Sequence, residues 1–125
     1  MGATLNEALA EAGVDIDGVM ERFLGKQELM EKFLFRFVND QTYSKVIDGM
    51  ENHDSDAMFK AAHALKGLSG NLGLTPVYEP LCELCDAMRH DGFDGPYEEP
   101  YEKMKVQYEK LVDVIKAYIP EGYSE

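Results

Sequence analysis

Residues Ala61–Gly73 read AAHALKGLSGNLG, a stretch that combines helix-forming residues with a lone histidine and three glycines. A helix turns by roughly 100° per residue, which divides this stretch and the turn before it into two faces. One face is apolar and carries Met58, Ala61, Leu65, Leu68 and Leu72. The opposite face carries His63 among Asp56, Phe59, Lys66, Gly67 and Gly70. The stretch therefore predicts a helix that buries its leucines and presents an imidazole to solvent.

Two of the glycines, Gly67 and Gly70, lie on the histidine face of this helix. Glycine inside a helix costs about 0.5–1 kcal/mol relative to alanine, so both positions need a physical reason. They could allow a second helix to pack closely, or they could leave room for another macromolecule to reach the imidazole. Because both lie on the polar side and not on the leucine side, we interpret them as access positions.

The pattern H-x-L-K-G-x-S-x-x-x-G, which starts at His63, resembles the signature of histidine-containing phosphotransfer (HPt) domains. These are the four-helix carriers of multistep phosphorelays. The resemblance extends more loosely over residues from about Val14 to Ile119, through helix lengths and spacing. It implies that Nε2 of His63 accepts and donates a phosphoryl group. It also implies that the partner is a receiver domain with a phosphorylatable aspartate, in a response regulator or a hybrid sensor histidine kinase.

The residues around His63 suit this chemistry only in part. Neutral imidazole is a nucleophile, and most exposed histidine is neutral at pH 7. Lys66, one turn along on the same side, can neutralise part of a phosphoryl charge as a point cation. The sequence has no nucleotide-binding G-x-x-x-x-G-K-[ST] loop and no acidic cluster near His63 that could hold magnesium. We therefore predict a phosphocarrier with no ATP site and no bound cofactor, whose partner supplies Mg²⁺ and the aspartate.

Three further residues are candidates for contact with the partner: Phe59, Lys60 and Gly70. Phe59 falls on the His63 face about one turn before the histidine, so its ring could meet the partner or be partly buried against a neighbouring helix. Lys60 and Gly70 flank the site more loosely. Phe35, elsewhere in the chain, also lies off the main apolar stripe of its helix. It could be exposed, covered by the N-terminal helices, or part of a docking patch.

The length, charge and composition of the chain limit the kinds of protein that it could be. The chain has 125 residues, 45% of them hydrophobic, which predicts one domain over 1–125 with a bundle core at about 26–120. Its net charge of −12 disfavours nucleic acid as a partner. The N-terminus lacks a basic start with an apolar run, and no stretch approaches the roughly 18 apolar residues of a membrane span. We expect a soluble cytoplasmic protein that does not bind membranes, and the start residue favours a free-standing carrier.

Apolar spacing and capping residues predict the helices in order. A capping box at Thr4 and a cap at Asp15 open short helices within 4–24. The longer helices are expected at about 26–50, from Asp54 or Ser55 to Leu72, from an N-cap at Thr75 to about 89, and from 96–100 to 119. No segment alternates with a period of two. The predicted fold is all-α, an antiparallel up-down four-helix bundle with a short helical N-terminal extension.

Three other interpretations compete with the phosphocarrier. The bundle could be a scaffold that binds a signalling partner without phosphorylation of His63. It could be a sensor-kinase dimerisation helix, but that helix usually carries an acid directly after the histidine, where this chain has Ala64, and four helices in one chain favour a monomer. It could bind metal through His63, Cys82, Cys85 or His90, although a zinc site needs four ligands and the sequence offers one C-x-x-C pair. We predict no metal site.

Overall fold

The computed structural model describes residues 4–123, and all of its regular structure is helical. The elements in chain order are α1 (Leu5–Glu11), α2 (Ile16–Arg22), α3 (Gln27–Asn39), α4 (Thr42–Glu51), α5 (Ser55–Asn71), α6 (Thr75–Met88), the 3-10 turn η1 (Gly92–Asp94) and α7 (Glu98–Lys116). Within the described range no strand occurs, as the sequence predicts. The ends of the predicted domain span, residues 1–3 and 124–125, lie outside the described residues.

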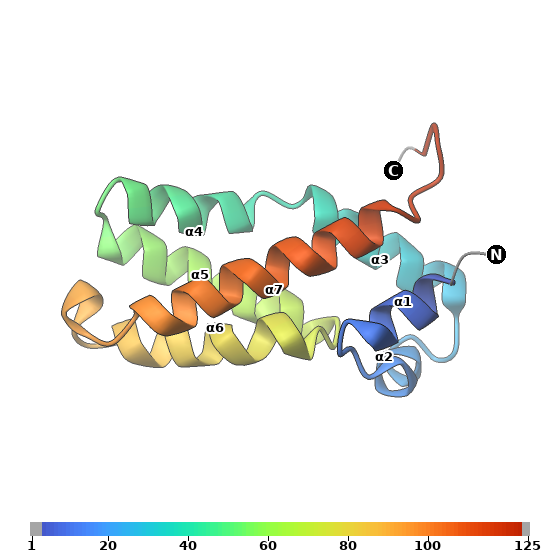
Figure 1. Ribbon diagram of the computed structural model, residues 1–125, viewed down its shortest axis with the longest axis horizontal. Coiled ribbons are helices and arrows are strands. Elements are labelled where there is room, and N and C mark those ends of the chain that lie inside the picture. The colour runs from blue at the N-terminus through green and yellow to red at the C-terminus, as the bar shows by residue number, and fades with distance from the viewer. Residues whose placement is uncertain (1–3, 124–125) are drawn as a thin grey trace.

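The helices form a bundle. Figure 1 shows α4, α5, α6 and α7 lying lengthwise beside one another, joined by turns at alternating ends. Helix α5 contacts both α4 and α6, and α6 contacts α7. At the end where both termini lie, α1 packs against α7, and α3 contacts both α2 and α7. The two short N-terminal helices therefore close one end of the bundle.

The core fixes the rotation of α5 about its axis. Its buried residues are Met58, Ala61, Ala62, Leu65 and Ser69. The largest fully buried side chains elsewhere include Leu9, Met30, Leu34, Leu74, Leu81, Leu84, Met104, Leu111 and Ile115. Burial of a leucine stabilises the fold by roughly 1.5–3 kcal/mol, so these contacts hold the apolar face inward. The opposite face of α5 is left to solvent in consequence.

The predicted single long helix over 26–50 is wrong, because the structure has two helices there, α3 and α4, with an interruption between them. Asp40 leaves the helix with extended backbone, and its carboxylate accepts a hydrogen bond of 2.8 Å from the backbone N–H of Thr42. The break falls in the polar run Asn39–Thr42, whose short side chains can compete with helical hydrogen bonds. The apolar residues before and after this interruption keep the spacing of one continuous helix. For this reason the sequence pattern alone does not reveal the interruption.

Two phenylalanines of α3 lie differently from what helical spacing predicts. Phe33 falls with Met30 and Phe37 on one apolar stripe, which predicts that it is buried, yet 38% of it is exposed. Phe35 is buried, and its ring meets the edge of Tyr123 with centroids 5.1 Å apart. Helix α3 contacts α2 and α7 as well as this C-terminal tyrosine, and these neighbours turn the Phe35 side inward. The burial of Phe35 removes it from any docking patch.

The helix ends agree with the sequence predictions better than the long helix over 26–50 does. Thr4 forms the predicted capping box with Glu7, and Asp15 and Asp54 cap α2 and α5. One cap is wrong: α6 has Leu74 as its N-cap, without a side-chain hydrogen bond, and Thr75 is already inside the helix. The predicted N-cap at Thr75 is thus displaced by one residue.

Candidate functional site

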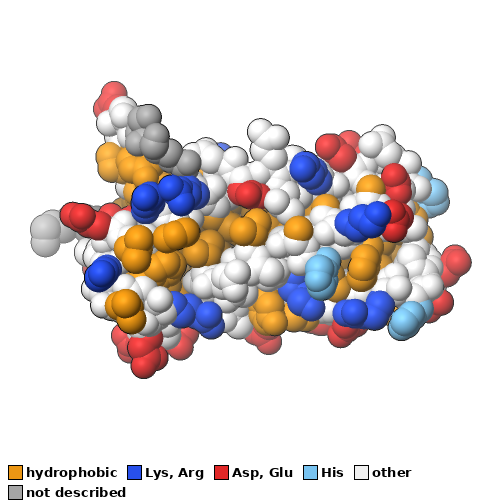
Figure 2. Space-filling view, turned by 180° about the vertical axis from the view of Figure 1, so that it is seen from behind, with side chains coloured by type: hydrophobic (Ala, Val, Ile, Leu, Met, Phe, Trp, Pro, Cys, Tyr) orange, Lys and Arg blue, Asp and Glu red, His pale blue; other side chains and the backbone are white. Residues whose placement is uncertain are grey.

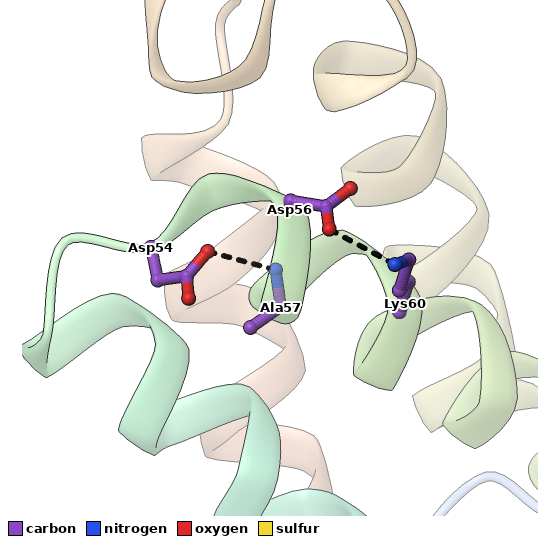
Figure 3. Close-up of polar contacts among 4 residues, drawn as sticks. All are labelled: Asp54, Asp56, Ala57 and Lys60. Atoms are coloured by element: carbon purple, nitrogen blue, oxygen red, sulfur yellow. Dashed lines mark hydrogen bonds and ion pairs between the residues drawn. The ribbon is translucent and has the colours of Figure 1, made fainter.

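Helix α5 positions the candidate site, and its own sequence fixes where it begins and ends. The carboxylate of Asp54 accepts a hydrogen bond of 3.1 Å from the N–H of Ala57, as Figure 3 shows. Gly73 follows the helix with a φ of +73°, the left-handed conformation expected of a residue just after a helix. The Ser69 hydroxyl is buried and donates to the carbonyl of Leu65 at 2.9 Å. Ser69 thus has a structural role within α5.

His63 is exposed in the middle of α5, on the side opposite Leu65. Its imidazole lies near the ring of Phe59, with centroids 6.2 Å apart and planes inclined by 21°. Phe59 is half-buried and packs against the core. The sequence left two possibilities open for Phe59, partial burial and contact with a partner. The structure shows the partial burial and also places the ring next to His63, where a partner could reach it.

The two glycines of the histidine face differ in their surroundings. A Cβ atom built on Gly67 would meet nothing within 4 Å. The same atom on Gly70 would lie 2.8 Å from the Cε1 atom of Tyr78 on α6. The surroundings of Gly67 therefore agree with the access interpretation, whereas those of Gly70 favour close packing between α5 and α6. For Gly70 the structure departs from what we expected of the sequence.

The two lysines near His63 are also in different environments. Lys60 forms an ion pair with Asp56 at 3.0 Å, and this contact raises the pKa of the lysine (Figure 3). Both side chains are about three-quarters exposed, at 75% and 76%, so the pair adds little stability. Lys66 is half-buried and makes no ion pair with any residue in the range 4–123. Of the two ammonium groups, that of Lys66 is better placed to meet an incoming anion.

A hollow of about 540 Å³ lies beside this face, between α5 and the start of α6. Its lining comprises Arg22, Lys66, Gly67, Gly70, Asn71, Gly73, Leu74, Thr75, Tyr78 and Glu79. The structure thus brings a second cation, that of Arg22 on α2, to the hollow that contains Lys66. Arg22 and Tyr78 could not be assigned to the site from the sequence, since both reach it only through tertiary packing. Figure 2 shows this side of the molecule, where lysine and arginine side chains surround hydrophobic ones.

The cysteines lie on α6, Cys82 half-buried and Cys85 buried. Burial raises the pKa of the Cys85 thiol, and the nearby charge of Lys66 opposes the rise in part. Across residues 4–123, three or more histidine, cysteine, aspartate or glutamate side chains do not gather in a group that could hold a metal ion. The residues of the alternative metal-binding interpretation, His63, Cys82, Cys85 and His90, thus do not form such a group. Nor does any helix in that range have the length and hydropathy to cross a membrane.

One comparison with known proteins gives a match. The family model described as Hpt domain matches residues 3–117 of this 125-residue chain. The match includes α1 to α7 and therefore the whole of the histidine face described above. Neither the curated proteins nor the solved structures give a match.

Proposed function

The chain belongs to the Hpt domain family, and from this membership we propose that it carries a phosphoryl group on His63 between receiver-domain aspartates. Hpt domains are phosphocarriers of phosphorelays and interact with receiver domains. Within the chain, we assign the transfer to His63. The observation that carries it is the exposed imidazole beside a glycine, Gly67, whose side is open to solvent.

The proposed step is a reversible exchange between two nucleophiles. Nε2 of neutral His63 attacks the phosphorus of an aspartyl phosphate, and the N–P bond forms while the P–O bond to the aspartate breaks. The aspartate leaves as a carboxylate, and the ring sheds its excess proton to solvent. Transfer onward to a second aspartate reverses these bond changes. Such a transfer depends mainly on positioning and on neutralisation of charge.

The residues of the chain support positioning and part of the charge neutralisation. Phe59 limits the orientations of the imidazole, and Lys66 supplies a cation next to the phosphoryl group. Mg²⁺ and the reacting carboxylate would come from the receiver, which makes this chain a carrier without an ATP site of its own.

We further propose that α4, α5, α6 and α7 form an antiparallel four-helix bundle, with α3 extending α4. In this proposal the protein works as a cytoplasmic monomer.

Labelling with phosphoramidate, a small phosphoryl donor, tests the reactivity of His63 without a partner. The wild type should gain one acid-labile, base-stable phosphoryl group, and His63→Gln should gain none. His53→Gln and His90→Gln are matched controls, because both residues are exposed and lie outside α5. Equal labelling of wild type and His63→Gln would contradict the assignment. It would favour the alternative, a scaffold that binds its partner without phosphorylation.

A further inference from the structure

The hollow of about 540 Å³ beside Lys66 is built by three helices, α2, α5 and α6, and by the turn between the last two. Figure 1 shows α2 at the end of the bundle where α5 turns back into α6. The volume falls within the range of about 300–1,000 Å³ that is usual for small-molecule pockets. Lys66 and Gly67 line the hollow, whereas His63, one turn earlier on α5, does not. The hollow therefore lies next to the histidine but is a separate space.

Arg22 reaches this hollow across the turn that joins α5 to α6. Gly73 in that turn has a left-handed φ of +73°. A Cβ atom built on Gly73 would lie 2.8 Å from Cγ2 of Val19 and 3.1 Å from Nε of Arg22. A side chain at this position would therefore push α2 and its arginine away. Because glycine occupies the turn, α2 packs closely on it and the side chain of Arg22 lines the hollow together with Lys66.

Both cations of the hollow are without an acidic partner. Within residues 4–123 neither Arg22 nor Lys66 forms an ion pair, and Glu79 is the single acid that lines the hollow. The groove between α6 and α7 is the reverse, since its described lining contains five acidic residues and no lysine or arginine. The chain as a whole has 24 acidic and 12 basic residues. A hollow with two unpaired cations in such a chain attracts anions to this one place.

The other walls of the hollow offer hydrogen-bond donors and an aromatic ring. Asn71 and Thr75 are exposed and bring an amide and a hydroxyl group to the rim, and both groups can donate to the oxygens of an anion. Tyr78 is half-buried, and its Cε1 atom lies 2.8 Å from where a Cβ atom of Gly70 would be. The ring of Tyr78 therefore rests on Gly70 and forms one wall of the hollow. A ligand with a flat apolar part beside its charge would gain contact with this ring.

We propose that this hollow binds a small phosphorylated molecule, whose phosphate contacts Arg22 and Lys66 and whose organic part lies against Tyr78. A phosphate monoester carries close to two negative charges at neutral pH, so it can engage two cations where a carboxylate neutralises one. The molecule is held without a covalent bond and is distinct from the phosphoryl group carried on His63. The binding site goes beyond the proposed function and does not depend on it.

Inhibition of transfer by the bound molecule does rest on the proposed function. Lys66 would neutralise the phosphoryl group on His63 and also the phosphate in the hollow. A molecule in the hollow therefore draws this cation away from the histidine and slows transfer. The hollow then acts as an inhibitory site that responds to the concentration of its ligand.

Titration of the ¹⁵N-labelled protein with phenyl phosphate, at constant ionic strength, tests the binding site. The amide signals of Gly67, Gly70 and Gly73 report on three sides of the hollow and should move and saturate in the wild type. Arg22→Gln should weaken the binding about tenfold or more. Lys26→Gln is the matched control, because Lys26 is an exposed cation outside the hollow, and should keep the affinity within about twofold. Equal affinities of Arg22→Gln and Lys26→Gln, or shifts that do not saturate, would overturn the site.

A second variant and a second probe test the charge and the ring separately. Asn71→Asp adds a negative charge at the exposed rim, so it should weaken the binding even if loss of Arg22 disturbs the turn. Unchanged affinity in Asn71→Asp would contradict the position of the phosphate. Inorganic phosphate should bind more weakly than phenyl phosphate, because it makes no contact with the Tyr78 ring. Equal affinity for the two probes would overturn the role of Tyr78 and assign the hollow to free phosphate.

Transfer from a phosphorylated receiver domain separates the hollow from the relay. Phenyl phosphate should inhibit this transfer, and the concentration for half-inhibition should rise about tenfold in Arg22→Gln, relative to the uninhibited rate of that variant. His63→Gln should bind phenyl phosphate as the wild type does. Saturable binding by a wild type that accepts no phosphoryl group would contradict the relay and support the hollow. Normal transfer without saturable binding would contradict the hollow and support the relay, and binding without inhibition would contradict the shared use of Lys66.

Discussion

The imidazole of His63 lies one helical turn from the ring of Phe59, with centroids 6.2 Å apart and planes inclined by 21°. Both residues belong to α5, and helical side chains lean toward the N-terminus, so the histidine ring leans over the phenylalanine. Because Phe59 packs against the core, its ring offers the exposed imidazole a fixed surface. We infer that Phe59 orients the imidazole of His63.

Substitution of Phe59 should therefore slow the chemistry even without a partner. We expect Phe59→Ala to lower the rate of phosphoramidate labelling about threefold to tenfold, because a less ordered imidazole attacks less often. Phe59→Leu, which keeps an apolar surface of similar reach, should recover most of the rate. If both variants label at the wild-type rate and only the KM for a receiver rises, Phe59 is a docking residue and does not position the ring.

The glycines of the histidine face give a prediction on stability. Gly67→Ala should stabilise the protein by about 0.5–1 kcal/mol, since alanine favours the helix and its Cβ meets open space. Gly70→Ala should lose this gain, because its Cβ would lie 2.8 Å from the Tyr78 ring. Urea unfolding of the two variants measures the difference. A stable Gly70→Ala together with an unfolded Gly67→Ala would reverse the roles given to the two glycines.

Access to the histidine is a separate prediction at Gly67. The long side chain of Gly67→Gln should leave the free energy of unfolding close to that of the wild type but slow transfer from a receiver domain about tenfold or more. Gly67→Ala is the matched control and should transfer almost normally. Normal transfer by Gly67→Gln would show that the open space beside this glycine is not on the partner's path.

The two lysines should differ in their effect on transfer. Lys66→Gln should lower the rate at least about tenfold, because the phosphoryl group loses its neighbouring cation. Lys60→Gln should change the rate by about twofold or less, since Asp56 already holds that ammonium group at 3.0 Å. Single-turnover transfer from a phosphorylated receiver gives both rates. Equal losses in the two variants would mean that a general surface charge matters and not the place of Lys66.

The cysteines should differ in their reaction with a thiol reagent. Burial raises the pKa of Cys85, so at pH 8 a smaller share of this thiol is ionised than of a free cysteine, and access to it is poor. We expect Cys82 to be alkylated at least about tenfold faster than Cys85 in the folded protein. Mass spectrometry of timed samples gives both rates, and the difference should vanish in urea. Equal rates in the folded protein would contradict the burial of Cys85.

Much of this fold could be predicted because its signals are local. The caps at Thr4, Asp15 and Asp54, and the left-handed Gly73, act within one or two turns of the chain. The rotation of α5 follows from the spacing of its leucines. The break at Asp40 could not be predicted in this way, because the apolar spacing of 26–50 continues across it and α4 begins without a side-chain cap.

The site could be predicted only along the helix that carries it. His63, Lys66 and Gly67 share one helix face, so helical phase alone places them together. Arg22 reaches the same hollow from α2, and Tyr78 covers Gly70 from α6. Neither follows from spacing, since each depends on how separate helices pack. The two glycines looked equivalent in the sequence for the same reason.

Phosphoryl transfer from a phosphorylated receiver domain of the same cell, with and without His63, tests the central claim most directly. We predict that the wild type gains an acid-labile, base-stable phosphoryl group as the receiver loses its own. His63→Gln should gain none, whereas His53→Gln and His90→Gln should match the wild type. Labelling that persists in His63→Gln, or a wild type that no receiver labels, would contradict the assignment of a phosphocarrier acting through His63.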